Sequence, residues 1–301
     1  MSGSGVVVVT GATGRQGGAV VRALLREGRS VRAVTRQPDR PKARALAAAG
    51  AAVVVADMED PHSLDRAFAG AAGVFSVQSF MTSGRDGEVR QGRNVGDAAR
   101  RARVRHLVYG SAAPGRRGTG VRSWESKLDV EDQLRELELP VTVLRPAAFM
   151  EVMTDRDFYP AVGVWHVWPK LASWEFRVPW LACHDLGVIA AKAFADPDGY
   201  IGRDLALAAE FRSLGECRSS YAAVTGRPPR RVPMPLWLFR RFTEDTARMW
   251  EWLRDNDVDV DPELTRSIHP EAMTVETWLR WRTAAQGLPD RHRRIRKRDL
   301  E

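Results

Sequence analysis

The sequence feature that most constrains the fold is a run of valines, close to the N-terminus, that ends on regularly spaced glycines. Residues 6–18 read VVVVTGATGRQGG, with glycine at positions 11, 14 and 17. Four consecutive valines are typical of a parallel strand that is buried on both faces. Glycine allows a tight turn after such a strand and lets a phosphate approach the amides that begin the next helix. The segment therefore predicts a strand, a phosphate-binding turn and a helix over residues 15–26.

Strands and helices are then expected to alternate along the chain. The expected strands cover residues 30–35, 51–56, 73–77, 105–110 and 141–144, and the expected helices cover 43–49, 61–69, 88–103 and 123–137. A helix over 185–194 and a short strand over 203–208, which is expected to rejoin the sheet, follow later. This alternation predicts an α/β fold, a Rossmann-type doubly wound parallel sheet with a smaller, mainly helical substrate lobe.

The pattern changes after Pro146, where Trp165, Trp168, Trp174 and Trp180 fall among prolines in short, irregular segments. Residues 1–150, completed by 184–209, are therefore predicted to form the nucleotide-binding domain. Residues 151–183 and 210–301 are predicted to form a substrate or partner lobe, helical from residue 211 onwards. We expect this lobe to lie across the carboxyl edge of the sheet, where ligands bind in such folds. The aromatic residues over 249–253 are expected to be core.

Composition narrows the cellular setting and the partners. The chain carries a net charge of +8, largely from arginine, and a basic run, RHRRIRKR, near its end. Charge alone does not identify a target, so nucleic acid is not the favoured partner and the tail is predicted to be solvated. With only two cysteines, no CxxC and no clustered histidines, neither a disulfide framework nor a metal site is expected. The sequence predicts a cytoplasmic protein without membrane helices, and leaves its oligomeric state open.

The end of the second expected strand indicates which dinucleotide would bind. An acidic residue there accepts the ribose 2′-hydroxyl bonds of NAD, whereas arginine accommodates the 2′-phosphate of NADP. This strand ends on Thr35 and Arg36, with Lys42 nearby and no carboxylate before Asp39. Since a guanidinium can hold a phosphate with charge-assisted bonds, the sequence predicts NADP(H).

With these features, the chain resembles the NmrA-like group of atypical short-chain dehydrogenases/reductases. The matching segments are TGATGRQGG, VTRQP, the strand that ends on Asp57, QGRNVGDAARRARVRHLVYGSA and LRPAAFMEV. The resemblance is specific over roughly the first 150 residues and looser around the HDLG segment. It implies an NADP(H)-binding domain whose cofactor contacts come from the glycine motif, the residues after it and several strand ends. The predicted contacts are Gly11, Thr13, Gly14, Arg15, Gln16, Gly17, Arg36, Lys42, Asp57, Met58, Gln78, Ser79, Phe80, Lys127 and Phe149.

The resemblance also implies roles for some of these residues. Asp57 and Met58 would lie beside the adenine, residues 78–80 along the cofactor and Lys127 by the nicotinamide ribose. Phe80 and Phe149, with Trp165 and Trp168, are the predicted substrate contacts.

A departure from the wider superfamily lies at the Tyr-x-x-x-Lys motif. The chain has Ser123 to Lys127 there, so the lysine stays and the tyrosine is missing. Serine is too weak an acid to replace a phenol near neutral pH. Lys127 and Ser111, which could hydrogen-bond an acceptor oxygen, are the predicted catalytic residues.

Two functions remain open at this point. The first is hydride transfer from NADPH to a small conjugated or aromatic acceptor: a quinone, an iminium, or an activated alkene or carbonyl. The group also includes redox-sensing regulators, so the second is a non-catalytic sensor of NADPH and NADP⁺ that acts on a protein partner.

Overall fold

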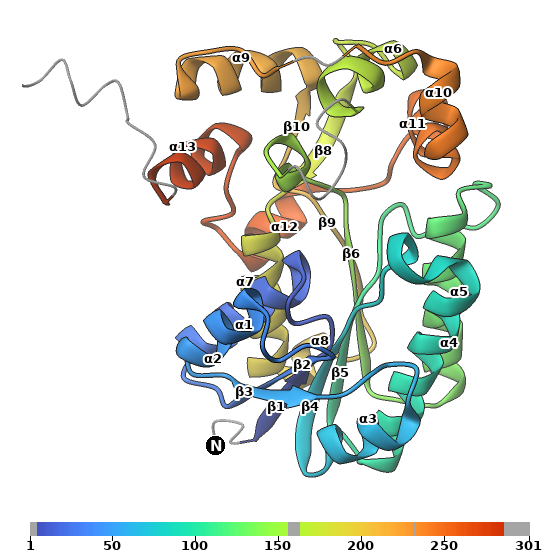
Figure 1. Ribbon diagram of the computed structural model, residues 1–301, viewed down its shortest axis with the longest axis vertical. Helices are drawn as coiled ribbons and strands as arrows, with labels where there is room; N and C mark the ends of the chain where they lie inside the picture. Colours follow the sequence, from blue (N-terminus) through green and yellow to red (C-terminus); the bar gives the residue numbers. More distant parts are fainter. Residues whose placement is uncertain (1–4, 156–162, 231–232, 286–301) are drawn as a thin grey trace, which may run out of the picture. The chain divides into compact units, whose positions relative to one another are not determined.

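The computed structural model describes residues 5–155, 163–230 and 233–285, and the chain divides into two compact units (Figure 1). The first unit comprises Met1–Ala147 and Cys183–Leu207, and the second comprises Ala148–Ala182 and Ala208–Glu301. The basic run near the end of the sequence lies outside the described residues. Within the described ranges, no helix is both long enough and apolar enough to cross a membrane.

A seven-stranded parallel sheet forms the centre of the first unit, with the strand order β3-β2-β1-β4-β5-β6-β9. The order runs outward from β1 in both directions, so the predicted doubly wound fold is confirmed. In such sheets, ligands bind beyond the carboxyl ends of the strands where the order reverses, here at β1 and β4. The strands are β1 (Val6–Val9), β2 (Val31–Thr35), β3 (Ala52–Val55), β4 (Ala71–Ser76), β5 (His106–Gly110), β6 (Val141–Pro146) and β9 (Asp204–Leu207).

Helices cover both faces of this sheet. They are α1 (Arg15–Arg26), α2 (Pro41–Ala48), α3 (Pro61–Phe68), α4 (Phe80–Arg101), α5 (Arg122–Glu136), α7 (Cys183–Ala195) and α8 (Pro197–Tyr200). Figure 1 shows α1, α2 and α7 on one side and α3, α4 and α5 on the other. Gly187 explains how closely α7 approaches α1, because a Cβ there would lie 2.6 Å from the carbonyl oxygen of Ala19. This contact ties the later segment of the unit to its first helix.

Helix α4 begins earlier than the sequence predicts. Its expected start is Glu88, whereas the observed helix begins at Phe80 and has a kink at Gly84, where φ is 66°. Only glycine adopts this conformation readily, so one turn of helix precedes the kink and the longer part follows it. The first turn carries little of the apolar periodicity that marks the rest of α4, which is why the prediction missed it. The kink carries the chain from the end of β4 into the helix that covers it.

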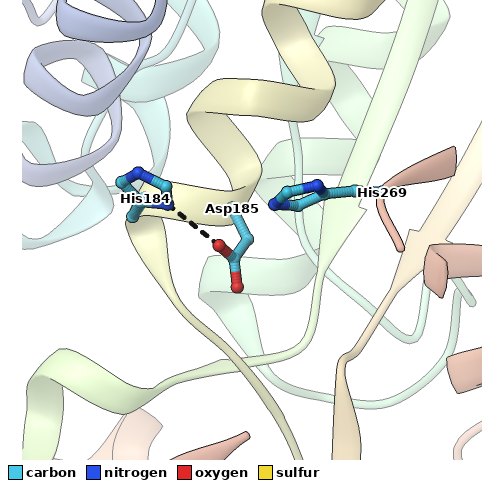
Figure 2. A group of neighbouring side chains, drawn as sticks. All are labelled: His184, Asp185 and His269. Carbon is cyan, nitrogen blue, oxygen red and sulfur yellow. Dashed lines mark hydrogen bonds and ion pairs between the residues drawn. The ribbon is translucent and has the colours of Figure 1, made fainter. Parts of the chain in front are cut away.

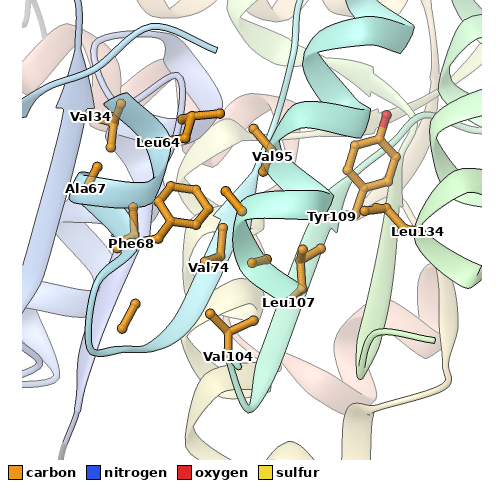
Figure 3. Close-up of a cluster of buried hydrophobic side chains, with 14 of the residues drawn as sticks. Val34, Leu64, Ala67, Phe68, Val74, Val95, Val104, Leu107, Tyr109 and Leu134 are labelled. Carbon is orange, nitrogen blue, oxygen red and sulfur yellow. The ribbon is translucent and has the colours of Figure 1, made fainter. Parts of the chain in front are cut away.

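One buried hydrophobic cluster of the first unit lies between the sheet and the helices α3, α4 and α5 (Figure 3). Phe68 from α3, Val95 from α4 and Leu134 from α5 are fully buried there. Tyr109 of β5 lies at one end of the cluster, beside Leu134. Burial of such side chains stabilises this face by roughly 1.5–3 kcal/mol each.

The second unit combines helices with a small sheet of strand order β10-β8-β7. Strand β8 pairs antiparallel with β10 and parallel with β7. The helical elements of the second unit are the 3₁₀ helix η1 (Met150–Met153), the π-helix η2 (Gly163–Val167), α6 (Trp168–Leu171), α9 (Leu214–Thr225), α10 (Leu236–Phe242), α11 (Glu244–Asp255), α12 (Pro262–Ile268) and α13 (Val275–Ala285). The strands are β7 (Ala148–Phe149), β8 (Arg177–Leu181) and β10 (Glu210–Ser213).

The expectation of helix from residue 211 is wrong over its first residues, because residues 210–213 pair with β8. Helix α9 begins only after Ser213, whose side chain and that of Glu216 form a reciprocal capping box. The spacing Ser-x-x-Glu is a sequence signal for a helix start, and it could have placed this boundary.

Candidate functional site

The glycine turn between β1 and α1 is shaped to receive an anionic group. Gly11 has φ +57°, and a Cβ on Gly17 would lie 2.4 Å from the carbonyl oxygen of Gly11. Gly14 caps α1 without a side-chain hydrogen bond, and the first turn of the helix contains no acidic residue. The first amides of a helix have no partner within the helix, and its positive end attracts anions. The turn therefore has the close backbone approach and the helix start that a phosphate group requires.

Three buried glutamine oxygens in the first unit have no hydrogen-bond donor among the described residues: that of Gln133 on α5, and two that follow strands of the sheet. Oε1 of Gln16 is on the first turn of α1, and Oε1 of Gln78 follows β4. The Gln78 side chain is 4% exposed, and its amide nitrogen donates to Oγ of Ser76 at 2.9 Å. A buried acceptor without a donor is costly, so the Gln16 and Gln78 positions suit a ligand that brings N–H or O–H groups. With the glycine turn, they are the features of this structure that fit a dinucleotide.

Met58 and Gln78, predicted to contact the cofactor, lie close together. The Gln78 amide nitrogen is 3.8 Å from the sulfur of Met58, and Asn94 donates to the Met58 carbonyl oxygen at 2.9 Å. Ser79 is exposed and Phe80 is half-buried at the start of α4. Residues from the ends of β3 and β4 therefore meet at this edge, although far apart in sequence.

Arg36 lies at the end of β2 with its side chain 70% exposed. Its Nη1 is 3.9 Å from Oδ2 of Asp57, which follows β3. The sequence shows no carboxylate between the end of β2 and Asp39, but the sheet brings the carboxylate of Asp57 beside Arg36. An exposed pair at this distance contributes little to stability and leaves the guanidinium available to a phosphate. Lys42, on the first turn of α2, is also exposed.

Lys127 is held by a buried carboxylate that the sequence interpretation did not single out. Its Nζ donates to the carbonyl oxygen of Gln78 at 2.9 Å and lies 2.8 Å from Oε1 of Glu88. Oγ of Ser126 donates to the other Glu88 oxygen at 2.5 Å. The partners of Glu88 lie on α5, 38 or more residues away, so no local motif could have indicated the contact. The ammonium group of Lys127, which comes from α5, thus lies at the end of β4, where the cofactor contacts are predicted.

Neither neighbouring hydroxyl replaces the missing tyrosine in a simple way. Ser123 is on the first turn of α5 and is half-buried. Tyr109 lies with its ring centroid 5.6 Å from Nζ of Lys127, but its hydroxyl is buried without a partner among the described residues. Burial, and then the nearby Glu88 and Glu131 carboxylates, raise the pKa of Tyr109 well above its usual value. The phenol therefore holds its proton more tightly than an ordinary tyrosine.

Ser111 follows β5, as predicted, and belongs to a second buried network. It is 2% exposed, and its Oγ donates to Oε1 of Glu131 at 2.6 Å. Arg145 also binds Glu131, with its Nη2 at 2.5 Å from Oε2 and 2.7 Å from Asp204. The hydroxyl hydrogen of Ser111 is thus directed at Glu131, so donation to an acceptor would require it to rotate.

The remaining predicted substrate residues belong to the second unit and are buried there. Phe149 is 8% exposed, Trp165 is 3% and Trp168 is 1%. The Trp168 ring lies 4.1 Å from that of Trp250, and Trp165 makes an edge contact with Tyr221 at 5.9 Å. Because both indoles pack within their own unit, contact with a substrate would require neighbouring side chains to move.

The HDLG segment, the looser part of the resemblance, begins α7 and contacts α1. His184 Nδ1 lies 2.9 Å from Oδ1 of Asp185, as Figure 2 shows, and Nη1 of Arg26 lies 3.1 Å from His184 Nε2. An arginine can only donate, so His184 accepts at Nε2 and donates from Nδ1 to the buried Asp185 carboxylate. This chain of hydrogen bonds joins the end of α1 to the start of α7.

The sequence matches a known protein family and individual members of it. The family model described as the NmrA-like family matches residues 3–280. The NmrA-like family domain-containing oxidoreductase FrzB from Cladobotryum sp. is 30% identical, over 90% of this chain and 96% of its own length.

Solved structures share the fold at lower sequence identity. Nmra, a negative transcriptional regulator solved with NAD, has a TM-score of 0.73 at 20% identity, covering 95% of this chain and 98% of its own. The triphenylmethane reductase of Citrobacter sp., solved with NADP(H), has a TM-score of 0.70 at 20% identity, covering 91% and 98%. At these identities the structural likeness establishes the fold alone.

Proposed function

Because this chain belongs to the NmrA-like family and resembles an oxidoreductase of that family along most of its length, we propose that it is an NADPH-dependent oxidoreductase. It passes hydride to a small conjugated or aromatic acceptor. The observation that carries this proposal is the glycine turn at the head of α1, together with the buried oxygens of Gln16 and Gln78, which have no donor among the described residues.

In this proposal the residues of the first unit hold the cofactor. The amides after Gly14 bind the pyrophosphate, and the exposed guanidinium of Arg36 binds the 2′-phosphate. Lys127 donates to a hydroxyl of the nicotinamide ribose. When bound, the reduced nicotinamide supplies the hydride. The solved relatives contain NAD in one case and NADP(H) in the other, so the preference for NADPH rests on Arg36.

The acceptor class follows from the missing acid. Ser123 is a poor proton donor, the pKa of Tyr109 is raised, and the hydrogen of Ser111 is directed at Glu131. A quinone, an iminium or an activated alkene can accept hydride without a proton from the enzyme in the same step. A general acid contributes about 10²–10⁴-fold, and positioning supplies much of the rest, so turnover is compatible with its loss.

Purified protein and NADPH are mixed with a panel of quinones, iminium ions, conjugated alkenes and simple aliphatic ketones. We expect the absorbance of the reduced nicotinamide to fall with members of the first three classes, and to fall little with the ketones. Faster reaction with the ketones would contradict the argument from the missing acid.

A second candidate function is favoured by the same observation, that the described residues place no effective proton donor near Lys127. In this alternative the protein binds NADPH or NADP⁺ and signals their ratio to a protein partner. Tight NADPH binding, no turnover across the panel, and a partner that distinguishes the reduced from the oxidised complex would select it.

A further inference from the structure

A fully buried carboxylate faces Lys127 across the α4–α5 contact. The Glu88 side chain is 0% exposed and that of Lys127 is 10% exposed. The two oxygens of Glu88 divide between Lys127 and Ser126, which are neighbours on α5. The Glu88–Lys127 contact lies next to the carboxyl end of β4, because Lys127 also donates to the carbonyl oxygen of Gln78, which follows that strand.

Stability alone does not account for this pair. Removing two charges from water is expensive, and replacing a buried ion pair by apolar residues is often neutral or stabilising. A neighbouring contact between these helices is apolar, since the Val130 side chain of α5 occupies the space that a Cβ on Gly92 of α4 would need. A retained ion pair beside such packing indicates a role that needs the ammonium group in a fixed place.

The contacts of Lys127 define where its ammonium can act. An ammonium has three N–H donors, and the carbonyl of Gln78 takes one of them. Oε1 of Glu88 attracts the ammonium from 2.8 Å as an ion pair, without the geometry of a hydrogen bond. One hydrogen bond and one ion pair thus hold Nζ in place, and N–H groups remain for a ligand. The carboxylate also balances the lysine charge, so the group is suited to hydrogen-bond a neutral hydroxyl more than to attract a phosphate.

We propose that Glu88 is a positioning residue, which holds Lys127 by ion pairing so that a remaining N–H of the ammonium reaches the nicotinamide ribose. The inference rests on the proposed function, because the proposed function is what places Lys127 beside that ribose. Ser126 supports the arrangement by orienting the Glu88 carboxylate. Glu88 itself does not touch cofactor or substrate.

The test compares two ligands that differ in whether they contain the nicotinamide half. NADPH and adenosine 2′,5′-bisphosphate, which lacks the nicotinamide ribose, are titrated into wild type, Glu88→Gln, Lys127→Met and the double variant. Loss of a well-placed charged hydrogen bond weakens binding about tenfold, so we expect Glu88→Gln to bind NADPH about tenfold more weakly. The bisphosphate should bind nearly as well as it does to wild type. The double variant should bind NADPH no more weakly than Lys127→Met, because Glu88 acts through the lysine.

Val130→Ala is the matched control, since it loosens the same α4–α5 contact and leaves the ion pair intact. It should lower the thermal stability without separating the two ligands. Equal weakening of both ligands by Glu88→Gln would assign it a merely structural role, and additive losses in the double variant would also overturn the proposal.

Glu88→Asp covers the case in which Glu88→Gln does not fold. It keeps the charge but shortens the reach to Nζ, and it should again weaken NADPH selectively; unchanged NADPH binding by this variant would refute the inference. The proposed function alone would fail if wild type turned over no acceptor, while Glu88→Gln still weakened NADPH and left the bisphosphate bound. Turnover by wild type combined with unchanged NADPH binding by Glu88→Gln would instead defeat the inference alone.

Discussion

At the scale of single residues, the surroundings of a side chain decide whether a ligand can reach it. The guanidinium of Arg36 is mostly in solvent, 3.9 Å from the partly exposed carboxylate of Asp57, so little holds it away from a ligand. His106 is the opposite case: it is 2% exposed and hydrogen-bonded to Thr142 at 2.8 Å. The Arg36 side chain is therefore accessible to a ligand, whereas the His106 side chain is enclosed by the fold and affects its stability.

Arg36→Ala should separate the two nicotinamide cofactors. A charged hydrogen bond to the 2′-phosphate contributes roughly 1.5–3 kcal/mol, so NADPH should bind about tenfold or more weakly. NADH, which lacks that phosphate, should bind almost unchanged. Fluorescence titration of both cofactors measures this, and an equal loss for both would show that Arg36 does not select between them.

His106 should make the folded protein less stable as the pH falls. Burial lowers its pKa from 6.5 to about 4, so below about pH 6.5 the unfolded chain takes up a proton that the folded protein does not. Between about pH 7.5 and about pH 5 this costs about 2 kcal/mol. Urea unfolding of wild type and His106→Gln at both pH values tests it, because the variant should lose less stability. An identical loss in both proteins would assign the effect to other groups.

At the scale of elements, the strand ends and helix starts determine what the first unit can hold. The turn from β1 into α1 exposes helix amides, and the kink at Gly84 carries the chain from β4 into α4. Helix α5 then supplies Lys127, whose contacts connect the residues on either side of that kink, Gln78 and Glu88. The packing of α4 on α5 therefore affects the site as well as the core.

Gly17→Ala should abolish cofactor binding through this turn. The new methyl group would lie 2.4 Å from the Gly11 carbonyl oxygen, so the turn must open and its amides shift. Gly28→Ala, at the other end of α1, is the control. Its Cβ meets nothing within 4 Å, and its φ of +69° costs only about 1–2 kcal/mol. NADPH titration and thermal unfolding should show lost binding for the first variant and a modest loss of stability for the second. Retained binding by Gly17→Ala would exclude this turn as the phosphate site.

At the scale of the whole molecule, each of the two units has its own core. The first is built around the parallel sheet, and the second around aromatic side chains such as Trp168 and Trp250. The second unit is formed from two separate stretches of chain, 148–182 and 208–301, so its folding depends on contacts between distant segments.

Trp168→Ala tests whether that tryptophan is core or substrate wall. Its ring is 1% exposed, so truncation should destabilise the second unit by roughly 3–5 kcal/mol. We expect a lower unfolding temperature in calorimetry, with NADPH binding by the first unit retained below it. Trp281→Ala, on a ring that is 46% exposed, should change the unfolding temperature little. A fully stable Trp168→Ala protein that turns over acceptors slowly would favour a direct role with substrate.

The sequence by itself determined the doubly wound sheet, the glycine turn after β1 and the place of Arg36 at the end of β2, because these features are local. Apolar runs define buried strands, glycine spacing defines a turn, and a strand end has a known place in such a sheet. Only the tertiary structure decided which distant side chains meet. It brought Asp57 beside Arg36, buried Glu88 against Lys127, directed Ser111 at Glu131, and placed Trp168 in the core of the second unit. Those pairs join residues on separate elements, and no short-range pattern encodes which helix or strand a buried side chain will face.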